Sequence, residues 1–389
     1  MLTTVMRIRC LLAIAASAAL VPILAACSQG DPRPAGVVTV SNGQCGARWQ
    51  LTRPGWHTFQ ISNQGTGGAE VDLIEPATGA VYAEVENTGP GTTTPMRLNV
   101  GSGRYAFLCL FADTGPRQGP VVTVSGHVAG TRAVLPVTYN DLIPLAKEYQ
   151  AQTESGLKVL AGQTAVLAAA VSRGNLAAAR RGWLTAHLQY ETLGDAYDAF
   201  GTFDTEIDGR ADAVGVTSPT WTGFYRLEYG LWHGQSLTSL IPVARTLNED
   251  TGKLVIWWQT QQVPLTDLGR RAHEVLENAL EFQLTGHDDY GSGTTLATTL
   301  ANIQATRALL TLLHPLLVPR YPGLTAVDNG LVRLQSLLVK ERLPDGWWVP
   351  VAQLSQPARQ AIDAACGQLL QELAPIASIT EPRNTAHGF

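Results

Sequence analysis

Residues 221–234, WTGFYRLEYGLWHG, hold the pair of side chains that most suggests chemistry. Tyr225 and Glu228 are three residues apart, so on a helix they share one face. A histidine in place of Tyr225 would make a metal-binding pair with the carboxylate. Ser218 can cap a helix and Pro219 suits its first turn, so the sequence predicts a helix that starts there.

Acidic side chains are concentrated just before this segment. Carboxylates from adjacent antiparallel helices are a common way for bundles to hold metals, because hard cations need several oxygens at once. Most acids of such a run belong to the solvated surface. Glu191 and Glu228 are the stronger candidates, because aromatic neighbours favour a buried position where a carboxylate needs a cation or a hydrogen-bond partner. Arg226 or Tyr225 could be that partner without any metal. The acidic run comprises Glu191, Asp195, Asp198, Asp204, Glu206, Asp208 and Asp212.

The histidines give weaker signals. His273 and Glu277 share a helix face, and the glycine-flanked stretch of residues 285–293, which contains His287 and Asp288, is expected to be a surface loop. The sequence has no GxSxG, HExxH, P-loop or GxGxxG motif. Nothing in it therefore indicates a hydrolase or a nucleotide site, and we expect a protein that is not an enzyme.

Composition narrows the function further. The chain has 389 residues, 45% of them hydrophobic, which is typical of a globular protein with two or three domains. Its formal charge of −5 and its lack of a basic cluster argue against nucleic acid as a partner. An acidic surface is compatible with cations as ligands.

The N-terminus predicts export from the cytoplasm. Arg7 and Arg9 precede a short, alanine-rich apolar run that ends in small residues, so residues 1–26 are interpreted as a secretory signal peptide. Residues 24–27, LAAC, also fit a bacterial lipobox, in which Cys27 becomes the lipidated first residue. We therefore expect an extracytoplasmic protein, in the cell envelope or periplasm, that is held to the membrane by this lipid.

Three cysteines remain after Cys10 and Cys27 are assigned to the N-terminal segment. Cys45 and Cys109 are compatible with a disulfide, which is usual in an oxidising compartment, or with a pair of metal-binding thiolates. The residues alone leave both alternatives open. Cys366 has helical spacing with Ile362, Leu369 and Leu373, so we expect it in the core.

The hydrophobic period divides the chain into two regions. Short β-branched and aromatic runs separated by turn residues predict a β-sandwich over residues 37–128. After a linker at residues 129–140, apolar residues recur at steps of three and four, which predicts an all-α helical bundle over residues 141–380. Besides early helical runs around residues 157–171 and 183–197, we expect helices at 234–248, 265–284, 294–314, 324–341 and 355–378.

Two segments together resemble a known family. Residues 183–212, WLTAHLQYETLGDAYDAFGTFDTEIDGRAD, and residues 221–234 are similar to the imelysin-like domain of the EfeO family of bacterial iron-uptake proteins. The β region, with Cys45 early and YAFLCL late, resembles the cupredoxin-like domain that precedes it there. The resemblance implies two stacked helical bundles that bind iron or a similar cation. It also implies delivery to a membrane iron permease, with a haem-type peroxidase as a further partner.

The resemblance also implies site residues. In the helical region, Glu191, Asp208 and Glu228 match family metal-site positions, and Tyr225 stands where the family's GxHxxE motif has histidine. In the β region the matching positions are Cys45, Cys109, Glu84 and Glu86, where copper is a further candidate.

The chain departs from the family pattern at other positions too. A second glutamate of some relatives is Gly194, and a later histidine and aspartate are Gly293 and Thr295. Loss of imidazoles disfavours Fe(II), Cu(II) and Zn(II), whereas a Tyr225 phenolate would favour Fe(III). Iron as Fe(III) or Fe(II) is thus the expected ligand. The alternative is an accessory or scaffold protein of the same type that has lost the helical site.

Overall fold

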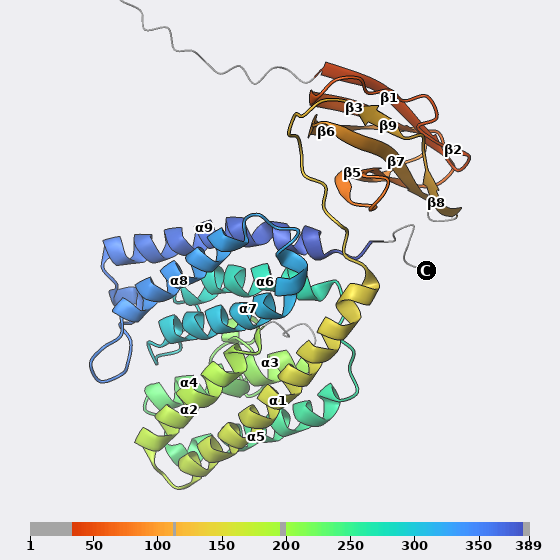
Figure 1. Ribbon diagram of the computed structural model, residues 1–389. Helices are drawn as coiled ribbons and strands as arrows, with labels where there is room; N and C mark the ends of the chain where they lie inside the picture. The colour runs from red at the N-terminus through yellow and green to blue at the C-terminus, as the bar shows by residue number, and fades with distance from the viewer. Residues whose placement is uncertain (1–32, 112–113, 195–199, 384–389) are drawn as a thin grey trace, which may run out of the picture.

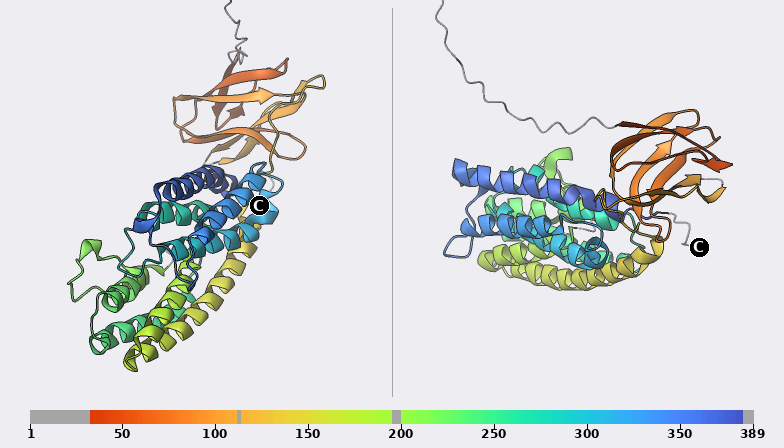
Figure 2. Two further views of the ribbon diagram at one scale, coloured as in Figure 1. Left: turned by 90° about the vertical axis from the view of Figure 1, so that its left-hand side faces the viewer. Right: turned by 45° about the horizontal axis from the view of Figure 1, so that its top comes forward.

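The computed structural model describes residues 33–111, 114–194 and 200–383. The expected signal peptide at residues 1–26 and the expected lipidation site Cys27 lie outside the described residues, as do Asp195 and Asp198. Figure 1 shows a sheet-rich N-terminal region joined by a connector to a larger helical region. Figure 2 shows that the β region lies at one end of the helices.

The β region consists of two sheets. One has the order β2-β1-β3-β6 and the other the order β5-β4-β7-β8, with β9 also paired to β7. The pairing of β1 with β3 is parallel, and the other ladders are antiparallel. The strands are β1 Arg33–Ser41, β2 Gln44–Cys45, β3 Gly55–Asn63, β4 Ala69–Ile74, β5 Val81–Thr88, β6 Thr93–Val100, β7 Gly103–Phe111, β8 Thr114–Gln118 and β9 Val122–Val124.

Alternating side chains build the core between these sheets. Phe59 of β3 and Phe107 of β7 are fully buried, and their ring centroids lie 5.5 Å apart. Trp49 contacts both rings edge-on, at 6.0 and 4.8 Å. This aromatic cluster joins the two sheets, because successive residues of a strand point to opposite faces and Phe59 and Phe107 point inward.

Cys45 and Cys109 form a disulfide within this core. Both residues are buried, and a bonded pair has no thiolate to offer, so the structure corrects the expectation that they bind a metal. Copper in the β region would therefore have to bind without these thiolates.

The helical region contains two groups of packed helices. In the first, α1 packs against α2 and α5, and α4 packs against both α2 and α5; in the second, α6–α9 pack on one another. Figure 1 shows the two groups as layers, with α2 and α7 in contact between them. The helices are α1 Tyr139–Ser172, α2 Leu176–Glu191, α3 Thr202–Asp208, α4 Gly223–Trp232, α5 Leu237–Trp258, α6 Asp267–Asn278, α7 Thr295–Leu317, α8 Leu324–Lys340 and α9 Gln356–Thr380.

A continuous hydrophobic core runs through both groups of helices. Cys366 of α9 is fully buried in it, which confirms the expectation for this residue. The helix α6 ends in a π-helical turn, Ala279–Gln283, and the loop that follows leads back to α7. The loop contacts α4 through hydrogen bonds to Tyr225 and Glu228, and turn and loop together position several of the side chains described below.

The helix that contains Tyr225 starts later than the sequence predicts. Ser218 and Pro219 belong to a turn, in which the Ser218 hydroxyl accepts a hydrogen bond from the Thr220 amide, and α4 begins at Gly223. Gly223 has a φ of +84°, which a right-handed helix from Pro219 cannot pass through. The expected helix start at Ser218 was therefore wrong, because local capping signals cannot reveal this left-handed residue.

Candidate metal site in the helical region

One face of α2 carries the buried polar residues of the site. Asn175 caps the helix by accepting from the Ala178 amide, and the aromatic Trp183 packs in the core below the site. His187 and Glu191 follow at steps of four and are only 2% and 1% exposed. The same helical period that buries Trp183 thus also buries an imidazole and a carboxylate.

His187 lies between two carboxylates. Its Nε2 is 3.2 Å from Glu191 Oε1 and 3.3 Å from Asp208 Oδ1. One candidate ligand atom from each of these three residues lies within 4.8 Å of the others. A nitrogen and two carboxylate oxygens at this spacing could hold a divalent or trivalent cation.

His187 was not among the site residues predicted from the sequence. Its signal was present, because His187 and Glu191 have the i,i+4 spacing that we weighed only for His273 and Glu277. The latter pair lies on α6, with 3.5 Å between His273 Nδ1 and Glu277 Oε2, and its glutamate is half exposed.

Two glycines lie close to the end of α3, the helix that carries Asp208. Asp208 is the last residue of α3, and at Gly209 a Cβ atom would lie 2.2 Å from the Thr205 carbonyl oxygen. At Gly223, the first residue of α4, a Cβ would lie 2.2 Å from the Ile207 oxygen. The contact at Gly209 lies within the last turn of α3. The end of α3 and the start of α4 can approach this closely only because Gly223 has no side chain.

His187, Glu191 and Asp208 are called the triad below, and the pKa values of His187 and Asp208 are strongly shifted. Burial alone would lower the pKa of His187, but its contacts with Asp208 and Glu191 outweigh burial and raise that pKa to about 10. Burial raises the pKa of Asp208 to about 8, against the opposing effect of His187. At neutral pH His187 is therefore an imidazolium, and it provides the positive charge between the two acids.

Glu191 has a further partner on α7. The Asn302 side-chain amide, in the orientation that satisfies both of its ends, donates to the Glu191 carbonyl oxygen at 3.1 Å and to Oε2 at 2.9 Å. Asn302 is 2% exposed. This contact ties the second group of helices to the triad and orients the carboxylate.

Tyr225 lies beside the triad. Its ring centroid is 5.4 Å from that of His187, and its hydroxyl donates to Asp288 Oδ2 at 3.3 Å. Burial, together with the charges of the neighbouring acids, raises the pKa of Tyr225 well above its ordinary value. Without a bound cation the side chain is therefore a neutral phenol, not the phenolate that Fe(III) would favour.

Asp288 is a further site residue that the sequence did not reveal. It was expected on a surface loop, but it is 3% exposed, and its Oδ2 also accepts from the Gln283 amide at 2.8 Å. Burial raises the pKa of Asp288 to about 6, while Arg210 opposes this effect. The loop folds inward here, which a pattern of glycine and charged residues cannot show.

Glu228 holds this loop through hydrogen bonds to its backbone amides. Its Oε1 accepts from the backbone amides of Tyr290 and Ser292, at 3.2 and 2.9 Å. Glu228 is 1% exposed, and burial raises its pKa to about 8. The carboxylate expected to be a ligand thus holds the loop that carries Asp288.

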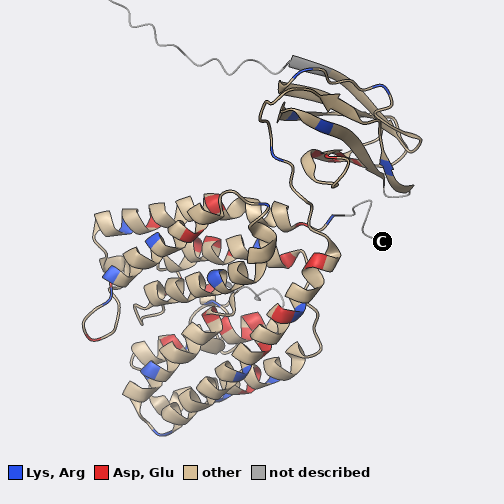
Figure 3. Cartoon of the chain, in the orientation of Figure 1, with Lys and Arg blue, Asp and Glu red and all other residues tan. Residues whose placement is uncertain are grey.

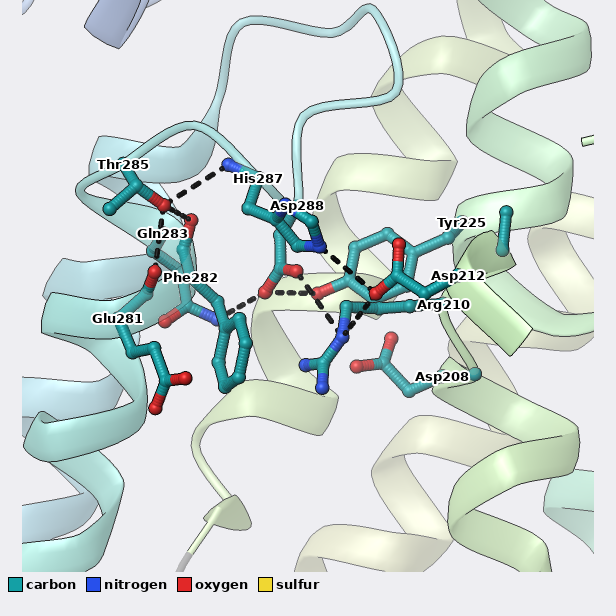
Figure 4. A network of polar contacts seen from close by, with 12 residues as sticks. Asp208, Arg210, Asp212, Tyr225, Glu281, Phe282, Gln283, Thr285, His287 and Asp288 are labelled. Atoms are coloured by element: carbon teal, nitrogen blue, oxygen red, sulfur yellow. Dashed lines mark hydrogen bonds and ion pairs between the residues drawn. The ribbon is translucent and has the colours of Figure 1, made fainter. Parts of the chain in front are cut away.

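Glu191, Asp208, Tyr225 and Asp288 line a cavity of about 580 Å³. Seven acidic and two arginine residues face it, and the closest view, in Figure 4, shows Arg210, Tyr225 and Asp288 converging from different segments. Figure 3 shows acidic segments around α3 in the middle of the helical region. The acids that line the cavity are Glu191, Asp204, Asp208, Asp212, Glu274, Glu277 and Asp288.

Arg226 does not neutralise the triad in this arrangement. Its Nη2 donates to Gln235 Oε1 at 3.0 Å. Gly293, where the family pattern has histidine, has a φ of +69° and lies against Pro350. Thr295 is the first residue of α7 and is buried.

Glu84 and Glu86 lie on the outer face of their sheet, whereas the disulfide lies in the core. Val85 between them points into the core that contains Cys109, so the two glutamates point outward. There Glu84 binds Arg383, whose Nη2 is also 3.7 Å from Glu86 Oε1. The expected set of two cysteines and two glutamates therefore does not converge.

The helical region matches a known protein family. The profile of the imelysin family, Peptidase_M75, matches residues 145–375. The "Iron uptake system component EfeO" of Yersinia pestis is 27% identical over 366 residues, which cover 92% of this chain and 94% of the relative. The protein of the same name from Escherichia coli (strain K12) is 24% identical over 346 residues, with 88% and 90% covered.

Proposed function

Because this chain belongs to the imelysin family, and resembles EfeO over most of its length, we propose that it is an iron-uptake component whose helical region binds iron. The observation that carries the proposal is the set of donor atoms of His187, Glu191 and Asp208, which lie within 4.8 Å of one another. Imidazole and carboxylate ligands suit Fe(II), and the surrounding carboxylates suit Fe(III). Iron is the cargo in this proposal, not a resident cofactor.

The geometry gives each residue a role. Glu191 and Asp208 would supply oxygens, and His187 would supply Nε2 once it has lost its proton. Tyr225 lies close enough to the triad to act as a further ligand, and Asp288 would accept the phenolic proton. Glu228 would keep the loop with Asp288 in place.

The location and partners belong to the same proposal. A lipid on Cys27 would anchor the protein outside the cytoplasm, and a membrane iron permease would receive the cation beside a haem-type peroxidase. We further propose that residues 37–128 form a cupredoxin-like domain, 129–140 the linker and 141–380 the imelysin-like domain. A role in uptake, not peptide cleavage, agrees with the names of the relatives as iron uptake system components.

Titration calorimetry tests the proposal directly. Fe(II) under anaerobic conditions and Fe(III) supplied as a nitrilotriacetate complex are titrated into the purified full chain. We expect the wild type to bind at least one of them, Glu191→Gln to bind it at least about tenfold more weakly, and the exposed-site control Glu249→Gln to bind normally. No binding by the wild type, or equal binding by Glu191→Gln, would overturn the proposal.

A second function is supported by one observation. The raised pKa of His187 already places a positive charge beside Glu191 and Asp208, and an accessory or scaffold protein could keep this arrangement without a metal. In that case the same titrations would give no heat for either iron species, while the fold and any docking to the permease would be unaffected by Glu191→Gln.

A further inference from the structure

Arg210 lies in the cavity wall two residues after Asp208. Its side chain is 37% exposed, and its guanidinium carbon lies 3.8 Å from the centroid of the Phe282 ring. This is the geometry of a cation–π contact, which holds the guanidinium against the π-helical turn. In Figure 4 the guanidinium is drawn between the Phe282 ring and the Asp208 carboxylate.

Two carboxylates face the same guanidinium. Arg210 Nε is 3.4 Å from Asp212 Oδ2 and 3.8 Å from Asp288 Oδ1. The other oxygen of Asp288 accepts from Gln283 and Tyr225, so Arg210 is the positive charge next to the free side of this carboxylate. Asp212 also contacts His287 Nε2 at 2.9 Å, at the exposed edge of the cavity.

The second arginine of the cavity is held differently. Arg271 has a side chain only 7% exposed, and it contacts Glu274 at 3.3 Å and Asp267 at 3.8 Å, both on its own helix α6. Moving it would break buried contacts, which is costly. The contacts of Arg210 have similar lengths, but its side chain is 37% exposed and Asp212 is 52% exposed, and ion pairs with exposed groups contribute little to stability. Of these two guanidiniums, Arg210 is the one that can leave.

We propose that Arg210 is the internal counter-ion of the cavity and that an incoming cation displaces it. This inference rests on the proposed function for the identity of the cation, but its chemistry requires only a hard multivalent cation. A cation near Asp208 and Asp288 would repel the guanidinium and satisfy the carboxylates in its place. Arg210 would then move away from Phe282 towards solvent. Because a cation must compete with the Arg210 charge for the carboxylates, ions that the carboxylates attract only weakly would not bind.

The test uses Tb(III), a hard trivalent probe whose luminescence nearby aromatic side chains sensitise. We expect Arg210→Gln in the full chain to bind Tb(III) about three- to tenfold more tightly than the wild type, because the competing charge is gone. Arg210→Lys, which keeps the charge, should stay close to the wild type. Arg97→Gln is the matched control, because Arg97 is also exposed and lies over an aromatic ring, Trp56, at 5.1 Å.

Chemical modification by phenylglyoxal, read by mass spectrometry, supplies a second readout. We expect Arg210 in the wild type to react several-fold faster when Tb(III) is bound, with no change at Arg97. Weaker Tb(III) binding by a folded Arg210→Gln, no Tb(III) binding at all, or slower reaction of Arg210 in the bound protein would overturn the inference. Tb(III) binding with displacement of Arg210 but no binding of either iron species would instead refute only the proposed function.

Discussion

His187 and Glu191 face each other across one turn of α2, with 3.2 Å between Nε2 and Oε1, and both are almost completely buried. The pair would be costly in isolation, because each charge leaves water. Asp208 provides the second acid and Asn302 a hydrogen bond to Glu191, so opposite charges already meet here without a cation. The ring nitrogens of His187 and the Oδ1 atom of Asp208 are nevertheless buried without a well-aligned hydrogen bond. In the same arrangement a cation could replace the proton of the His187 imidazolium.

Removing the imidazole should destabilise the protein. We expect His187→Ala to lower the free energy of unfolding by roughly 3–5 kcal/mol at neutral pH, because the buried acids Glu191 and Asp208 lose the positive charge between them. The pKa of His187 is raised in the folded state, so its contribution is fully present below about pH 6.5 and is lost as the pH rises through about 10. Urea unfolding across this range measures it. A variant as stable as the wild type at pH 7 would show that His187 is not charged.

Metal binding should release a proton. His187 has a raised pKa, about 10, and only the neutral imidazole can bind a metal through Nε2. We therefore expect the affinity for Fe(II) to increase as the pH rises from about 6 to 8, within the range where Fe(II) stays soluble without oxygen. Calorimetry in buffers with different ionisation enthalpies counts the protons. Binding heats that do not depend on the buffer would contradict this prediction.

Tyr225 should determine which metals are preferred. Tyr225→His restores the imidazole of the GxHxxE pattern, so we expect about tenfold tighter binding of Zn(II) or Fe(II) and a lower preference for Fe(III). The control is Tyr225→Phe, which removes the bond to Asp288 and should cost roughly 0.5–1.5 kcal/mol of stability. If the histidine variant bound divalent cations no better than Tyr225→Phe, the residue at this position would not be a ligand.

Glu228 should act through the loop that it holds. Glu228→Ala leaves the amides of Tyr290 and Ser292 without their acceptor, at a cost of roughly 1–3 kcal/mol, and should speed their hydrogen exchange. Glu228→Gln keeps a carbonyl acceptor and should protect both amides. Because the folded pKa of Glu228 is raised to about 8, its stabilising contribution is lost as the pH rises through about 8, and the glutamine variant should lack this dependence. Equal exchange in both variants would rule out the anchoring role.

The disulfide should stabilise the β region. Cys45 and Cys109 are 64 residues apart, and closing a loop of that length is worth about 4 kcal/mol in the chain-entropy treatment. We expect the double variant Cys45→Ser/Cys109→Ser to lower the melting temperature of the β region and to leave iron binding by the helical region unchanged. Loss of iron binding in this variant would show that the two regions are coupled.

The large elements could be predicted from local patterns. The change from a two-residue to a 3.6-residue period separates the strands from the helices, and each predicted helical run from residue 265 onward overlaps a helix of the structure. Glu191 and Glu228 are buried as their aromatic neighbours indicated. Periodicity indicates which face of a helix or strand is apolar, and neighbouring residues of the sequence are enough to show it.

Local patterns could not predict which residues come together to form the site. Asp288 was expected in solvent, but the loop turns inward because Glu228 binds two of its amides. Glu84 and Glu86 were grouped with Cys45 and Cys109, yet the strand alternation places the glutamates on the other face of the sheet.

The sequence by itself determined the sheet-rich and helical regions and the burial of Glu191 and Glu228. Only the tertiary structure decided that His187 lies between Glu191 and Asp208, that Tyr225 is a neutral phenol bound to Asp288, and that Arg210 faces the same cavity. The reason is that charge and protonation depend on which groups meet in space. The close contact of Gly223 with Ile207 joins α3 to α4, and the hydrogen bonds to Glu228 join the loop of Asp288 to α4; a one-dimensional pattern contains neither contact.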